Sequence, residues 1–242
     1  MKSWYLSTAC LILISSSPGL GIEPQQLLEK VDQAEFAPRD TTAEVKMLLI
    51  EPDGKTSERR MVMYQKGNNK RLIRFESPAD VQGVSFLDAE GKMYVYLPAF
   101  HKIRLVAGSM KNENFAGTDF AHEDLSSERF SDRLQAVELR EEGDHFILTT
   151  KDKNKDSRYS KLIFRVRQAD FLFDRVEYYD RNGELWKEFV REDFRPVKSY
   201  TQSFIAQMTD HKRKHSTKMI VEKLEVDKNL SDSLFSKRQL KR

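Results

Sequence analysis

The alternating pattern of this 242-residue chain breaks once, at Phe115-Ala-Gly-Thr-Asp-Phe-Ala-His-Glu-Asp-Leu125. Residues 107–130 around this stretch show no sustained alternation of apolar and polar side chains. Either Thr118 or Asp119 can cap a short helix that runs through Leu125, because its side-chain oxygen can accept a hydrogen bond from an unpaired amide. Aromatic side chains are spaced along the stretch at Phe115, Phe120 and Phe130. The sequence therefore predicts a helical insertion between two groups of strands.

Six segments before the insertion alternate with a period of two, which is typical of half-buried strands. They are Thr42–Ile50, Glu58–Gln65, Lys70–Phe75, Val84–Asp88, Met93–Leu97 and Ile103–Val106. The links between them are short and carry turn residues, as in Pro52-Asp-Gly54 and Gly67-Asn-Asn69. Short links of this kind make consecutive strands antiparallel.

Seven further strand segments follow the insertion. They are Leu134–Arg140, His145–Thr150, Ser160–Gln168, Leu172–Asp180, Glu184–Phe194, Ser199–Thr209 and Thr217–Val226. Asn182-Gly183 is the clearest hairpin turn among their links, because these residues tolerate the positive φ angles of a tight turn. Within Met219–Val226 the apolar positions change phase after Val221, which predicts a β-bulge or a similar irregularity.

An amphipathic helix is predicted ahead of the strands, over residues 24–35. Pro24 suits the first turn of a helix, and the apolar residues that share one face are Leu27, Leu28, Val31 and Ala34. Pro38 closes the helix off. At the other end of the chain, the tail Leu230–Arg242 is predicted to form a short helix or an extended arm.

Many of the predicted strands have one apolar face and one polar face. Within Lys161–Gln168, the apolar face carries Leu162, Phe164 and Val166. A twisted sheet of eleven to thirteen strands curls rather than staying flat. Its apolar faces then line a concavity that the N-terminal helix and the insertion can cover, and such a concavity can hold a ligand. For any single aromatic residue, a place in an ordinary sealed core is the favoured interpretation, and only the set as a whole favours a cavity.

The first 21 residues are typical of an export signal. A lysine precedes the apolar run Trp4–Ile14, and small residues follow, so we expect cleavage after Gly19 or Gly21. The apolar run is too short to span a bilayer, which needs about 20 residues. The sequence thus predicts a signal peptide over residues 1–21 and a single soluble domain over residues 22–242.

The only cysteine of the chain, Cys10, lies inside the predicted signal. Lipid attachment requires an apolar residue three positions before the cysteine, and Ser7 stands there, so we expect no lipid anchor. After cleavage no disulfide is possible, and packing of the core must hold the domain together.

Charge and motif content argue against several classes of function. The chain has 41 basic and 38 acidic residues, a near balance that lacks the basic excess of a nucleic-acid-binding protein. His122, Glu123 and Asp124 are the strongest candidates for catalysis or metal binding. Three consecutive residues point in different directions on a helix, and no second histidine stands near them at the spacing of a metal site. We therefore predict no enzymatic activity, no cofactor and no metal ion.

Seven motifs along the chain carry a resemblance to a known family. They are Arg71-Leu-Ile-Arg-Phe75, Pro78-Ala-Asp-Val-Gln-Gly83, Tyr96-Leu-Pro98, Ile103-Arg104, Phe115-Ala-Gly-Thr-Asp-Phe120, Glu123-Asp-Leu125, and Leu234-Phe235 with Leu240. In this order they cover essentially the whole predicted domain. With them the chain resembles the LolA/LolB-like superfamily, and more closely its group of outer-membrane lipoprotein-sorting proteins.

The resemblance implies a mainly β (α+β) fold, a curled antiparallel half-barrel of about eleven strands with an N-terminal helix and a helical lid over an apolar cavity. It implies a monomeric carrier in the periplasm of a Gram-negative bacterium, which binds the acyl chains of lipoproteins or lipids and moves them toward the outer membrane. The implied partners are the lipid or acylated lipoprotein, an inner-membrane transporter or an outer-membrane receptor, and no nucleic acid. Two alternatives stay open: a periplasmic accessory of a lipid-exporting RND-type pump, and a non-enzymatic envelope sensor or adaptor.

Candidate site residues follow from alternation, from position and from the resemblance. The candidates for the cavity and its lid are Phe75, Phe86, Tyr94, Tyr96, Phe115, Phe120, Leu162, Phe164 and Val166. In the soluble carrier of the superfamily, an arginine on an early strand ties down the lid in the empty state. The candidates for that role are Arg71, Arg74 and Arg104. We further predict that Phe115 and Phe120 fill the empty cavity and swing out when it is loaded.

Overall fold

Thirteen β-strands form one antiparallel sheet in the computed structural model, which describes residues 21–242. The strands ahead of the insertion are β1 (Asp40–Ile50), β2 (Thr56–Lys66), β3 (Lys70–Ser77), β4 (Ser85–Ala89), β5 (Lys92–Leu97) and β6 (Lys102–Val106). The strands after it are β7 (Leu134–Glu142), β8 (His145–Asp152), β9 (Tyr159–Arg167), β10 (Phe173–Asp180), β11 (Leu185–Val197), β12 (Tyr200–Asp210) and β13 (His215–Val226). Each segment that alternates in the sequence is a strand, so the sheet exceeds the about eleven strands that the resemblance implies. The predicted signal peptide and Cys10 lie outside the described residues.

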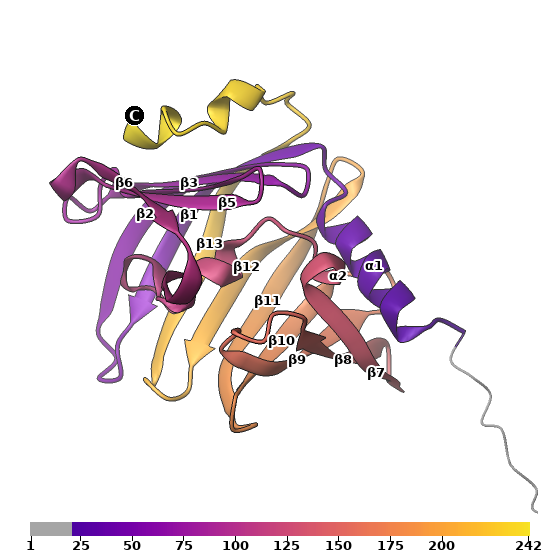
Figure 1. Ribbon diagram of the computed structural model, residues 1–242. Helices are drawn as coiled ribbons and strands as arrows, with labels where there is room; N and C mark the ends of the chain where they lie inside the picture. Colours follow the sequence, from indigo (N-terminus) through magenta and orange to yellow (C-terminus); the bar gives the residue numbers. More distant parts are fainter. Residues whose placement is uncertain (1–20) are drawn as a thin grey trace, which may run out of the picture.

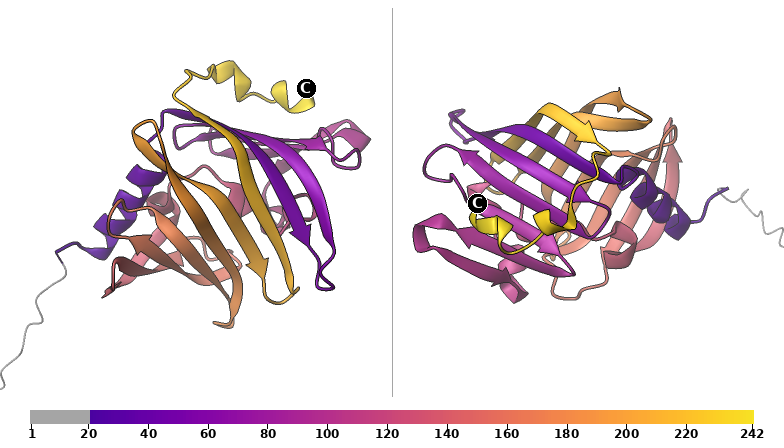
Figure 2. Two further views of the ribbon diagram at one scale, coloured as in Figure 1. Left: turned by 180° about the vertical axis from the view of Figure 1, so that it is seen from behind. Right: turned by 90° about the horizontal axis from the view of Figure 1, so that it is seen from above.

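The order of the strands is β6-β5-β4-β3-β2-β1-β13-β12-β11-β10-β9-β8-β7. β1 and β13 pair in the middle and join two meanders, whereas β6 and β7 are the two edges (Figure 1). The sheet curls and so has a concave and a convex face (Figure 2). The β1–β13 register shifts where Glu44 pairs with Lys223 and Val45 pairs with Val221. This shift confirms the irregularity that the apolar pattern of Met219–Val226 predicts.

The link between β6 and β7 crosses the concave face, because the strands that it joins are at opposite edges of the sheet (Figure 1). It contains the short 3-10 helices η2 (Gly108–Asn112), η3 (Phe115–Gly117) and η4 (His122–Leu125), followed by the helix α2 (Phe130–Arg133). The insertion at residues 107–130 is therefore where the sequence places it, and it covers the concave side.

The insertion does not contain the helix that the sequence predicts from Thr118 or Asp119 through Leu125, and that prediction is wrong in detail. Ala121 is extended, with a φ of −75° and a ψ of 162°, so the backbone leaves the helical region inside the predicted range and only the turn His122–Leu125 is helical. The Oδ2 atom of Asp124 accepts a 2.8 Å hydrogen bond from the Ala121 amide. Asp124 thus caps the start of η4, and the side chain of Asp119 binds elsewhere.

The N-terminal helix α1 (Pro24–Glu35) is present as predicted, and it packs beside α2 and β7. Its apolar face is fully buried at Leu27, Leu28 and Val31. Asp32 on the same face accepts hydrogen bonds from the amides of Phe130 (2.7 Å) and Ser131 (2.9 Å), so it holds the start of α2. None of the helices within residues 21–242 has both the length and the hydropathy that crossing a lipid bilayer requires.

The tail after β13 lies on the convex face, over β3, β4 and β5 (Figure 2). It forms two short 3-10 helices, η5 (Asp232–Leu234) and η6 (Gln239–Lys241), where the sequence predicts either a short helix or an extended arm. Phe235 and Leu240 are buried against Leu72 and Leu87 of the sheet. The tail therefore covers apolar side chains that point away from the concave face.

Candidate functional site

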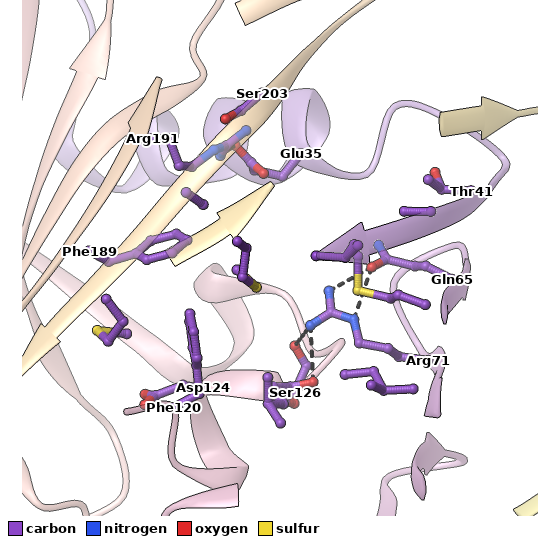
Figure 3. Close-up of a pocket in the computed structure, with 18 of the residues that line it drawn as sticks. Glu35, Thr41, Gln65, Arg71, Phe120, Asp124, Ser126, Phe189, Arg191 and Ser203 are labelled. Carbon is purple, nitrogen blue, oxygen red and sulfur yellow. Dashed lines mark hydrogen bonds and ion pairs between the residues drawn. The ribbon is translucent and has the colours of Figure 1, made fainter. Parts of the chain in front are cut away.

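A cavity of about 290 Å³ lies between the concave face of the sheet and the insertion. Strands β1, β2 and β3 form one wall of the cavity, and strands β10 to β13 form the opposite wall. The insertion supplies a further wall between them (Figure 3). Its apolar lining includes Ala43, Val45, Ile73, Phe115, Phe120, Leu125, Phe173, Val176, Phe189, Ala206 and Val221. The volume is at the lower end of the roughly 300–1,000 Å³ of typical ligand pockets.

Methionines are concentrated in this cavity. Five of the eight methionines of the chain line it, namely Met47, Met61, Met63, Met208 and Met219. The unbranched, polarisable methionine side chain adapts its shape to irregular surfaces. The lining is thus suited to flexible apolar ligands of varied shape. The sequence does carry a signal for these residues, because Met61 and Met63 alternate along one strand and so share one face. A prediction of the cavity lining from aromatic residues alone misses them.

Arg71 in β3 ties the insertion to the sheet. Its Nη1 atom donates hydrogen bonds to the carbonyl oxygens of Leu125 and Ser126, both at 3.0 Å (Figure 3). Its Nε and Nη2 atoms donate to the Oε1 atom of Gln65 at 3.0 and 2.6 Å. Burial lowers the pKa of Arg71. Arg71 thus makes the contact with the insertion that the resemblance implies for an early-strand arginine.

The other two arginine candidates do not contact the insertion. Arg74 is on the opposite face of β3, and its guanidinium donates to the carbonyl oxygen of Gln239 in the tail. Arg104 is exposed on the edge strand β6. Of these three residues, the structure brings Arg71 alone to the cavity.

The two insertion phenylalanines bind different halves of the sheet. Phe115 stacks on Phe75 of β3 with ring centroids 5.6 Å apart, and it also contacts Phe86 of β4. Phe120 meets Phe189 of β11 edge to face at 5.8 Å. The insertion thus bridges the two half-sheets, and both of its phenylalanines line the cavity between them.

The remaining predicted site residues lie outside the lining of the cavity. Phe75 and Phe86 are in the core beneath Phe115. A second core cluster near α1 contains Leu162, Phe164 and Val166. On the convex face, Tyr94 and Tyr96 pack with the tail. Their part in lipid binding stays a prediction.

A buried polar cluster holds the middle of the insertion. The Oδ2 atom of Asp119 accepts hydrogen bonds from Nδ1 of His215 at 2.6 Å and from Oγ1 of Thr217 at 2.7 Å. The Nζ atom of Lys187 donates to the backbone carbonyl of Asp119 at 2.7 Å and lies 3.6 Å from Asp124. Asp119 and Lys187 have no exposed surface. No sequence pattern indicates this cluster, because its partners are distant along the chain.

Glu123 is a buried carboxyl group beside the cavity. Burial raises its pKa to about 7, with a further contribution from the neighbouring charge of Asp124. Its Oε1 atom has no hydrogen-bond partner among residues 21–242. No group of three or more His, Cys, Asp and Glu side chains in this part of the chain is placed to hold a metal ion.

An ion pair joins the end of α1 to the sheet at another side of the cavity. It forms between Arg191 of β11 and Glu35, and both side chains are largely buried (Figure 3). The Arg191 guanidinium also lies 4.5 Å from the ring centroid of Phe173. Polar groups therefore border an otherwise apolar and methionine-rich space, an arrangement that suits an amphiphilic ligand.

Comparison with known structures places this architecture in a superfamily. A domain from Vibrio parahaemolyticus described as an outer membrane lipoprotein-sorting protein domain is 26% identical, with a TM-score of 0.81 over 91% of this chain and 100% of that chain. A DUF1329 family protein from Desulfovibrio piger is also 26% identical, with a TM-score of 0.82 over 90% of this chain and 97% of the other. A LolA superfamily protein from Nitrosomonas europaea shares the fold at 19% identity, with a TM-score of 0.75 and coverage of 90% and 99%.

The open antiparallel sheet with its covered cavity is thus the fold of the LolA-like superfamily, and the resemblance to its outer-membrane lipoprotein-sorting group is confirmed. A family model with the description "uncharacterized protein" matches residues 67–242, and the chain belongs to that family. No protein with a curated function matches the sequence.

Proposed function

We propose that the protein is a periplasmic carrier that binds acyl chains of lipoproteins or lipids and moves them toward the outer membrane. The observation that carries the proposal is the apolar, methionine-rich cavity under an insertion that Arg71 fastens to the sheet. In this proposal the protein acts as a monomer, binds and releases its cargo without chemical change, and receives or delivers it through a transporter or receptor in a membrane.

The energies involved are compatible with reversible loading. Each buried methylene contributes about 0.8 kcal/mol. Two hydrogen bonds from a charged donor are worth roughly 3–6 kcal/mol, which equals the contribution of about four to eight methylenes. One acyl chain can therefore displace the insertion from Arg71, and a partner that rebinds the chain can reverse the step.

Phe115 and Phe120 give the insertion a further role. Both side chains line the cavity, and each is packed on one half-sheet. We propose that they occupy part of the space that cargo fills and move away on loading. If Phe115→Ala and Phe120→Ala leave lipid affinity and release unchanged, this role is excluded.

Lipid extraction and mass spectrometry test the main proposal. The processed protein is purified from its own periplasm without detergent, and bound amphiphiles are quantified against protein. A stoichiometric acylated peptide is the expected result. A free phospholipid or a polycyclic lipid would indicate lipid transport beside a pump instead, and an empty protein would favour a sensor or adaptor.

A further inference from the structure

The hairpin formed by β5 and β6 ends the sheet with side chains that are both apolar and basic. Phe100 and Leu105 are 62% and 53% exposed, the highest values among the large apolar side chains of residues 21–242. Lys102 and Arg104 are also exposed, on the side of β6 opposite to Leu105, so cations and apolar side chains border this edge from both sides. Residues 91–112 contain no aspartate or glutamate, although the whole chain has 38 acidic residues. This edge of the sheet is thus unusually positive and unusually apolar.

The tail brings four more cations to the same edge. They are Lys237, Arg238, Lys241 and Arg242, and all four are exposed. The Nζ atom of Lys237 lies 4.2 Å from the ring centroid of Tyr94 in β5, and Tyr94 pairs with Leu105 in β6. In Figure 1 the end of the tail lies above β5 and β6. We name this surface the basic edge; it consists of Phe100, Lys102, Arg104, Leu105, Lys237, Arg238, Lys241 and Arg242.

The tail is fixed in this position by contacts on its inner side. Leu240 is fully buried, and its carbonyl oxygen accepts a 2.6 Å hydrogen bond from Oγ of Ser85. The guanidinium of Arg74 binds the carbonyl oxygen of Gln239 next to it. The cations that flank these anchors consequently point outward, so the basic edge is a property of the folded chain.

The cations of the basic edge lack acidic partners. None of the six forms an ion pair with another residue of the described chain, 21–242. By contrast, two lysines of the sheet do have an acidic partner in the tail. Lys66 of β2 and Lys70 of β3 both form ion pairs with the carboxylate of Asp232, at 2.9 and 2.8 Å. The basic edge therefore presents uncompensated positive charge beside two exposed apolar side chains.

We propose that the basic edge docks the protein on an anionic lipid surface. Cations near such a surface are attracted by the lipid head groups, and aromatic and leucine side chains enter the boundary between head groups and acyl chains. Phe100 and Leu105 favour a lipid surface over an acidic protein or a nucleic acid. A lipid surface offers acyl chains to these two exposed apolar side chains as well as negative charge to the cations, whereas a surface that is only negatively charged offers no apolar contact. Docking through this edge does not depend on what the cavity holds.

Vesicle sedimentation tests the inference on the processed protein. We expect binding to vesicles of phosphatidylglycerol and phosphatidylcholine, weak binding to phosphatidylcholine alone, and loss of binding as salt rises. Each cation contributes roughly fivefold to partitioning at low salt. Lys102→Gln combined with Arg104→Gln should thus lower partitioning by at least about fivefold, and Phe100→Ser should lower it further.

The matched control is Lys151→Gln combined with Lys155→Gln, which removes two exposed cations near the opposite edge of the sheet. This control should partition like the unmodified protein. Equal losses in the two double variants, equal binding to neutral and anionic vesicles, or no binding at all would each overturn the inference. Cavity occupancy by lipid, measured on the same samples, should stay unchanged, so failure of docking is distinguishable from failure of the carrier proposal.

Discussion

Arg71 in β3 and Leu125 in the insertion are joined directly, with the Nη1 atom of Arg71 3.0 Å from the carbonyl oxygen of Leu125. The same nitrogen binds the carbonyl oxygen of Ser126. The buried carboxylate of Asp88 in β4 accepts further hydrogen bonds from the hydroxyl of Ser126 and from the amide and hydroxyl of Ser127. This part of the insertion is therefore fastened to two neighbouring strands, by Arg71 of β3 and by Asp88 of β4.

Replacing Arg71 should loosen the insertion and leave the apolar lining of the cavity unchanged. In Arg71→Met the two hydrogen bonds to the insertion are lost, so we expect faster exchange of a fluorescent fatty acid and a free energy of unfolding lower by about 3–6 kcal/mol. Stopped-flow displacement and urea unfolding measure the two quantities. Arg140→Met, at an exposed site of β7, is the control and should change neither. Unchanged exchange in Arg71→Met would contradict the fastening role.

Asp119→Asn should destabilise the protein strongly. The carboxylate accepts hydrogen bonds from His215 and Thr217 inside a fully buried cluster. Weakening a buried charged network typically costs about 3–5 kcal/mol, and urea unfolding should show a loss of about 3 kcal/mol. Asp53→Asn, in the exposed β1–β2 turn, serves as the control. A loss no larger than that of the control would show that this cluster does not hold the insertion.

Glu123 should make stability depend on pH. Its pKa is about 7 in the folded protein and has an ordinary value of 4.5. Between these values the folded carboxyl keeps a proton that the unfolded chain has lost, so unfolding releases a proton and stability falls as pH rises through this window. The loss should reach about 3 kcal/mol above pH 7.

Comparison of variants isolates this contribution. Glu123→Gln should flatten the decline of unfolding free energy between pH 4.5 and 7, whereas Glu128→Gln, at an exposed position of the insertion, should leave it as it is. Urea titrations at several pH values measure the slopes. Parallel curves for the unmodified protein and Glu123→Gln would exclude Glu123 as the titrating group.

Ala206→Trp should reduce cargo binding by filling the cavity. Ala206 lines the cavity from β12, and the larger side chain takes space that an acyl chain would use. Crowding should cost about 1–3 kcal/mol of stability, while the lipid that co-purifies should fall severalfold by mass spectrometry. Ala169→Trp, at an exposed turn, is the control. Full lipid occupancy in Ala206→Trp would place the cargo elsewhere.

Alternation predicted the strands well because one face of most strands is buried. Tyr159–Arg167 shows the reason, since Leu162, Phe164 and Val166 are buried and the residues between them are only partly covered. The position of the insertion was equally visible, because a period of two cannot continue through Phe115–Leu125. Local patterns therefore determine the elements of this fold.

Local patterns do not determine which buried face meets the cavity. Tyr96 and Phe75 both lie on strands and are both buried, yet Phe75 packs against the insertion and Tyr96 packs under the tail. The difference depends on which segment returns to cover each face. The partners of Asp119 could not be predicted from local patterns either, because His215 and Thr217 are 96 and 98 residues away along the chain.

The link between β6 and β7 has much more length than its path requires. Its roughly 27 residues could reach about 90 Å if extended, whereas thirteen strands laid flat would span only about 58 Å. Tension in the link therefore cannot keep the sheet curved. Its position depends on separate points of attachment at Arg71, Asp119 and Asp32. Arg71 belongs to β3, the partners of Asp119 belong to β13 and Asp32 belongs to α1, so the attachment of the link is divided among distant parts of the fold and does not depend on one contact alone.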